Sequence, residues 1–112
     1  MEWTVSTLDN DVTLVAVTGR MDVAGALKAD PAFAEIAQGS RRLIVDVSRL
    51  DFLASLGIRT LVTTCKTLRA KNGSMVLLNP QASIEKTLRS SGIDTIIPLV
   101  KDLAAAAASV LV

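Results

Sequence analysis

Segments with a strand period and segments with a helix period alternate along this chain, and that alternation restricts the possible folds more than any other feature. Two β-branched runs, EWTVSTLD and DVTLVAVTGRMD, meet at Asp9, Asn10 and Asp11, which predicts a hairpin. The pattern after the hairpin predicts a helix, then three repeats of a strand followed by a helix. Strands separated by helices over short connections pair in parallel through right-handed crossovers. We therefore expect an α/β fold with a mixed sheet, in which an initial hairpin precedes mainly parallel strands packed with about four helices.

Periodicity and capping residues locate the expected elements. Val12 and Leu14 share one face of the second run, and Val15 and Val17 share the other, so this strand is expected inside the sheet. Later strands are expected at 41–48, 74–78 and 94–100. The first helix is expected at 31–39, with Asp30 as its N-cap and Pro31 as its first residue. The second is expected from 56 onward and stops at Asn72 and Gly73. The third is expected at 79–92, beginning with Asn79 and Pro80, and the fourth at 101–112, capped by Asp102.

Composition limits the size and the surroundings of the molecule. The 112 residues suit one domain spanning 1–112. Half of them are hydrophobic but only 3% are aromatic, so the core must be built from Val, Leu, Ile and Ala. The formal net charge is +1 and there are no long charged runs, so the charge pattern does not indicate nucleic-acid binding. The start resembles no signal peptide and no run approaches the ~20 apolar residues of a membrane span, so we expect a soluble cytoplasmic protein without membrane insertion.

Several kinds of site lack the residues that they need. The chain has no histidine, which removes the usual base of serine hydrolases and the commonest transition-metal ligand. Cys65 is the single cysteine, so no internal disulfide or multi-cysteine metal site is expected. It falls on the apolar stripe of its helix and is expected in the core. No Gly-rich phosphate loop is present, and we expect no cofactor. Asp46 ends a predicted interior strand and is expected to bond loop amides.

Ser55, within FLASLGIRTL, is the candidate functional residue, and three roles are open to it. It sits at the predicted start of a helix, where a serine cap stabilises by ~1 kcal/mol. A nucleophilic role would need another base, since histidine is absent. A modified hydroxyl is the third role, because a phosphate is tolerated at the positive end of a helix.

Three segments in register carry a resemblance to a known family. LIVDVSRLDFLASLGIRTLV, VTGRMD and LLNPQASIEKTLRSSGID resemble the STAS domain of bacterial anti-sigma factor antagonists, over nearly the whole chain. The resemblance implies a single STAS-like domain that is not an enzyme. It implies Ser55 as phosphoacceptor, Asp22 as the acidic residue after the first Gly element, and Gly57 as the helix-start glycine. The family often has Asp-Ser-Ser-Gly or Asp-Ser-Thr-Gly where this chain has Ala54, Ser55, Leu56 and Gly57.

The resemblance also implies a mechanism called partner switching. The unphosphorylated form binds a serine kinase of the histidine-kinase-like ATPase fold that is also an anti-sigma factor, which frees a sigma factor or other target. Phosphorylation at Ser55 releases the kinase, and a serine phosphatase restores binding. Arg59, Thr60 and Thr63 are expected on the exposed helix face beside Ser55. The expected partner-binding residues are Asp22, Ala54, Ser55, Leu56, Gly57, Arg59, Thr60 and Thr63.

Two other functions stay open. One is a STAS subunit of a larger assembly, a stressosome-like scaffold or a lipid transport complex, without a phosphorylation switch. The other is a small hydrolase or nucleotide-binding protein that uses Ser55. Partner capture, turnover and nucleotide binding distinguish them.

Overall fold

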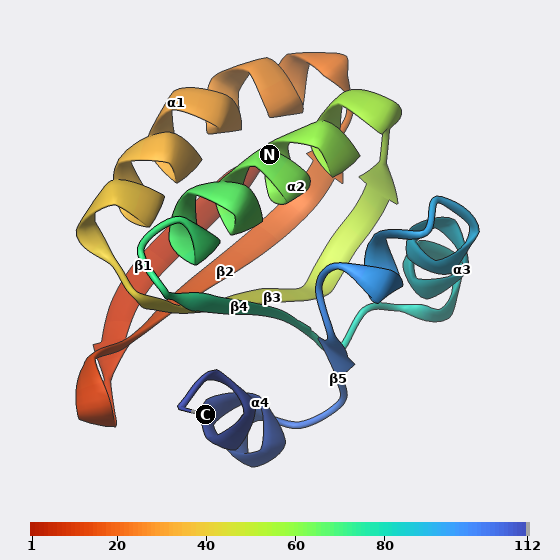
Figure 1. Cartoon of the computed structure of the whole chain (residues 1–112). Coiled ribbons are helices and arrows are strands. Elements are labelled where there is room, and N and C mark those ends of the chain that lie inside the picture. The colour runs from red at the N-terminus through yellow and green to blue at the C-terminus, as the bar shows by residue number, and fades with distance from the viewer. Residues whose placement is uncertain (112) are drawn as a thin grey trace.

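The computed structural model describes residues 1–111 and contains one five-stranded sheet (Figure 1). The strands lie in the order β1-β2-β3-β4-β5, with β1 antiparallel to β2 and every other pair parallel. This confirms the expected mixed sheet. The strands are β1 (Glu2–Leu8), β2 (Val12–Met21), β3 (Arg42–Leu53), β4 (Ser74–Leu78) and β5 (Leu99–Val100). The helices are α1 (Val23–Gly39), α2 (Ser55–Arg69), α3 (Ala82–Ser90) and α4 (Leu103–Val110), with 3-10 turns η1 (Asp9–Asp11) and η2 (Ile93–Thr95).

Helices cover both faces of the sheet, which explains why the central strands are apolar throughout. Figure 1 shows α1 and α2 over one face and α4 under the other. Val45 of β3 belongs to the core beneath α1, α2 and α3, whereas the adjacent Ile44 packs with Ala106 and Val110 of α4. Successive strand residues face opposite sides, so a strand between two helical layers needs apolar residues at every position. The expected core of aliphatic side chains is confirmed.

The hairpin and the final helix form as predicted. Asn10 and Asp11 take the left-handed backbone conformation, with φ of 63° and 56°, and β2 is an interior strand between β1 and β3. The Asp102 carboxylate accepts a hydrogen bond from the Ala105 amide at 2.8 Å and so caps α4, as expected. The expected helix also included Val112, which lies outside the described residues.

The prediction for the first helix is wrong at its start. Helix α1 begins at Val23 and not after Asp30, and its N-cap is Asp22, whose carboxylate accepts a bond from the Gly25 amide at 2.8 Å. The first turns bury small residues, Gly25, Ala26 and Ala29, so they lack the large apolar side chains by which a helix period is recognised. Pro31 lies inside the helix, where it lacks an N–H for the preceding turn.

Three other boundaries also differ from those expected. Strand β3 continues through Asp51 to Leu53, so no loop separates it from the residue before α2. Helix α3 begins at Ala82, after Gln81, and not at Asn79 and Pro80. The expected strand at 94–100 is largely wrong, because Ile93–Thr95 forms a 3-10 turn and only Leu99–Val100 pairs with β4. Ile93 and Ile97 are buried there, so the apolar side chains that suggested a strand instead pack a turn against the core.

Lys71, in the turn after α2, forms hydrogen bonds to the end of α1. Its Nζ donates to the carbonyl oxygens of Ala37, Gln38 and Ser40 at 2.6, 2.8 and 2.7 Å. The last carbonyls of a helix lack partners within the helix and carry partial negative charge, so a lysine there satisfies them. This contact fixes the distal ends of the two helices whose other ends form the site described below.

We predict that Lys71→Met lowers the free energy of unfolding by about 1.5 kcal/mol, because three carbonyls lose a charged donor while the apolar stem is kept. Denaturant unfolding measures the effect. Lys66→Met is the matched control, since Lys66 is an exposed lysine of α2. Equal stability of the two variants would show that the Lys71 contacts contribute nothing.

Candidate functional site

Ser55 is the first residue of α2 rather than its cap. The Ile58 amide donates to the Ala54 carbonyl at 3.1 Å, so the first helical hydrogen bond ends at Ala54, which is the N-cap. Ala54 has no side chain that accepts a bond, and no side chain caps α2. Of the three roles open to Ser55, the N-cap is therefore excluded. Its side chain is exposed at the positive end of the helix.

The start of α2 is fixed against the end of β2. The Ala54 amide donates to the Met21 carbonyl at 2.9 Å, and Met21 pairs with Leu53 across the parallel strands. Asp22 follows Met21 and caps α1, so the acidic residue and Ser55 come to the same edge of the sheet. The structure thus brings together the expected group at Asp22 and at 54–57.

Gly57 is a glycine because of close packing. A Cβ at this position would lie 2.8 Å from Met21 Cγ and 2.9 Å from Leu53 Cδ1. Both neighbours are buried core residues, with Met21 only 1% exposed. The glycine lets the first turn of α2 approach the ends of β2 and β3 closely, which positions Ser55 over the strand ends.

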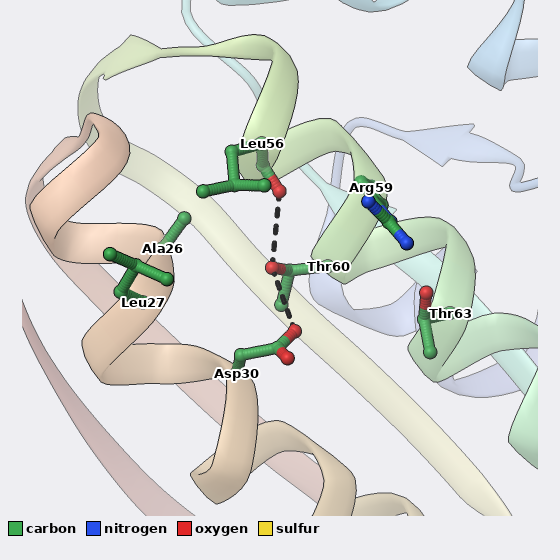
Figure 2. A pocket seen from close by; sticks show the side chains of 7 residues that line it. All are labelled: Ala26, Leu27, Asp30, Leu56, Arg59, Thr60 and Thr63. Carbon is green, nitrogen blue, oxygen red and sulfur yellow. Dashed lines mark hydrogen bonds between the residues drawn. The ribbon is translucent and has the colours of Figure 1, made fainter.

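A groove of about 250 Å³ runs between α1 and α2 beside this turn. Figure 2 shows Leu27 and Asp30 on α1 facing Leu56 and Thr60 on α2. Arg59 and Thr63 also line it and are exposed, as expected.

The prediction that Thr60 is exposed is wrong, since it is 3% exposed at the helix contact. Its hydroxyl lies 3.1 Å from Asp30 Oδ1 and 3.2 Å from the Leu56 carbonyl oxygen, so two acceptors face one donor. Asp30 therefore accepts a hydrogen bond from α2 and does not cap α1. Sequence patterns missed this role because Asp-Pro is also a common start of a helix.

Exposed apolar side chains lie on the segments around Ser55. Val23 is 58% exposed, Leu27 64% and Phe52 40%, while Arg20 lies over the Phe52 ring with its guanidinium carbon 4.4 Å from the ring centroid. Exposed apolar side chains rimmed by polar ones mark interaction sites. Phe52 adjoins Leu53, which belongs to the core beneath α1 and α2, so Phe52 points to the opposite face of the sheet. We therefore define the Ser55 surface by the residues on α1 and α2 alone, which are Val23, Leu27, Ser55, Leu56 and Arg59.

Cys65 takes the structural role expected of it, and Asp46 does so only in part. Cys65 is buried in the core between the sheet and the helices, and burial raises the pKa of its thiol above the ordinary 9.0. A raised pKa leaves less of the reactive thiolate at neutral pH. The Asp46 carboxylate accepts a hydrogen bond from the Ser48 amide at 3.0 Å, but both residues lie inside β3, beside an irregularity in its pairing with β2, and not at the end of the strand.

Residues 1–111 contain no group of three or more His, Cys, Asp and Glu side chains arranged to hold a metal ion. No helix among them has the length and apolar character needed to cross a membrane.

Comparison with known proteins identifies the family. The family model of the STAS domain matches residues 4–106. The chain belongs to the STAS domain family. It is 31% identical over 111 residues to a protein of Bordetella bronchiseptica assigned as the anti-sigma factor antagonist BtrV, with 97% of this chain and 94% of that protein covered. This STAS domain therefore belongs with the anti-sigma factor antagonists, as the sequence resemblance predicted.

Solved structures confirm the fold. An anti-sigma factor antagonist from Mycobacterium paratuberculosis has a TM-score of 0.88 at 24% identity, with 99% of this STAS domain and 94% of that chain covered. Bacillus SpoIIAA in its phosphorylated form has a TM-score of 0.71 at 20% identity, with 93% and 96% covered. SpoIIAA in its unphosphorylated form has a TM-score of 0.70 at 19% identity, with 91% and 89% covered. The expected STAS fold is confirmed.

We predict that Gly57→Ala destabilises this STAS domain by about 1–2 kcal/mol, because overpacking at Met21 and Leu53 exceeds the gain of about 1 kcal/mol in helix propensity. Denaturant unfolding measures the change. Gly39→Ala is the control, since a Cβ there meets nothing within 4 Å. The packing argument fails if the two variants are equally stable.

Proposed function

We propose that this STAS domain works by partner switching through Ser55. Its unphosphorylated form binds an anti-sigma factor that is also a serine kinase of the histidine-kinase-like ATPase fold, and a sigma factor or other target is thereby freed. The kinase transfers the γ-phosphoryl group of ATP to Ser55 Oγ, the hydroxyl proton leaves, and ADP is released. A serine phosphatase hydrolyses the ester and restores the binding form. The chain is a binding module and a substrate, and the reactions belong to its partners.

The observation that carries the proposal is an exposed hydroxyl at the start of α2, with exposed apolar side chains on the neighbouring segments of the chain. Ser55 is exposed at the start of α2, and Val23 and Leu27 lie on α1 beside it. Such side chains form the well-packed centre of protein interfaces when a partner covers them. A hydroxyl is small and weakly polar, so a partner surface accommodates it readily.

A phosphate on Ser55 changes the partner contact far more than it changes the fold. It adds about −1.5 to −2 charges and three acceptor oxygens at neutral pH. Ser55 already faces solvent at a helix start, so its own domain needs no rearrangement. A partner that covers Val23 and Leu27 would have to desolvate the phosphate, which weakens binding by orders of magnitude for a cost of a few kcal/mol.

The test is capture of partners from the native cell extract with four forms of the chain. We predict that wild type and Ser55→Ala retain a serine kinase of the ATPase fold, identified by mass spectrometry, and that Ser55→Asp loses it. Ser83→Asp is the matched control, because Ser83 is an exposed serine in the first turn of α3, remote in sequence from the Ser55 surface. It should retain the kinase.

Phosphopeptide mapping completes the test, since the captured kinase and ATP should modify Ser55 and leave Ser55→Ala unmodified. Capture of one and the same large assembly by all four forms would contradict the switch. That outcome would instead support a STAS subunit of a stressosome-like scaffold or a lipid transport complex.

A further inference from the structure

Arg59 follows Ser55 by four residues on α2, and both side chains are exposed. Residues four apart in a helix are neighbours on its surface, about 5–6 Å apart at their Cβ atoms. Helical side chains lean toward the N-terminus, over the preceding turn. In the unmodified chain the Arg59 side chain extends toward Thr63 (Figure 2), and because it is long and exposed, a change of rotamer brings its guanidinium back over the turn that Ser55 begins.

The Arg59 guanidinium has no anionic partner within residues 1–111. The two ion pairs there both involve Arg89, which lies on α3. Asp30, the carboxylate in the same groove, is instead bonded by the Thr60 hydroxyl. A cation stands one turn from the proposed phosphoacceptor with its charge uncompensated.

The first turn of α2 also lacks every acidic group. No acidic residue lies in that turn, and the N-cap, Ala54, offers no acceptor. By contrast, the carboxylates of Asp22 and Asp102 accept hydrogen bonds from backbone amides at the starts of α1 and α4. An anion attached to Ser55 would thus meet no like charge within its own turn. The acidic residue that shares this edge of the sheet is Asp22, whose carboxylate already accepts the Gly25 amide.

We propose that the phosphate on Ser55 is held by Arg59 of the same helix. This inference rests on the proposed function, because it concerns the phosphorylated state of the same serine. The planar guanidinium of arginine donates two parallel hydrogen bonds to phosphate oxygens, a geometry that lysine lacks. The pair fixes the phosphate against the helix and takes Arg59 away from any partner. One modification would then both add an anion to the Ser55 surface and occupy its cation.

The pair has two measurable consequences. A neighbouring cation favours the dianionic phosphate, so it lowers the second pKa of the phosphate, which is ordinarily about 6. It also forms only in the folded helix, so phosphorylation raises the melting temperature more with Arg59 than without it. Neither consequence follows from a purely structural role of Arg59 in the unmodified protein.

The experiment installs phosphoserine at position 55 during translation, so that no kinase is needed. The full chain is made as wild type, Arg59→Gln, Arg59→Lys and Lys66→Gln, each with and without the phosphate. Lys66→Gln removes the same charge from the same helix about three turns from Ser55. The phosphate is titrated by ³¹P NMR, and thermal unfolding is followed by circular dichroism.

We expect the second pKa of the phosphate to be about 0.2–0.4 units higher in Arg59→Gln than in wild type. Lys66→Gln should match wild type, and Arg59→Lys should lie between the two. The gain in melting temperature on phosphorylation should shrink in Arg59→Gln alone. Identical titration of wild type and Arg59→Gln would overturn the inference.

Failure of this pair is distinguishable from failure of the proposed function. If the captured kinase modifies Ser55 but Arg59→Gln titrates like wild type, only the pair is wrong. If the installed phosphoserine shows the pair but no kinase modifies Ser55, only the switch is wrong.

Discussion

The parallel pairing of β2 with β3 is the constraint on which the site depends. It places Met21 beside Leu53 at the carboxyl ends of the two strands, and the Ala54 amide then bonds to the Met21 carbonyl. Both following helices must begin at this edge, α1 after its Asp22 cap and α2 at Ser55. Gly57 allows the second helix to start in close contact with the strand ends. The candidate phosphoacceptor is therefore placed by the sheet itself.

A switch at such a position acts on binding and leaves the fold in place. Ser55 faces solvent, and the core beneath α2 is formed by the opposite helix face, which includes Leu61, Cys65 and Leu68. The apolar groups that a partner would cover lie on the other segments of the Ser55 surface, chiefly Val23 and Leu27. Charge added at the serine changes what the partner must desolvate, while the domain's own core is unaffected.

The sequence predicted the features that depend on local patterns. The hairpin, the interior strands, buried Cys65 and the helix after Leu53 all follow from hydrophobic period and turn residues. The start of α1 was missed because Gly25, Ala26 and Ala29 are buried without being large. The burial of Thr60 and its bond to Asp30 depend on how α1 packs on α2, and no local pattern encodes that contact.

The most direct test of the account is a calorimetric titration of the captured kinase with the unmodified chain and with the chain carrying phosphoserine at position 55. The account predicts at least a tenfold loss of affinity, about 1.4 kcal/mol, with an amide NMR spectrum that changes only around the starts of α1 and α2. Equal affinity would contradict the switch. A loss of affinity accompanied by unfolding would contradict the claim that the phosphate acts on the interface.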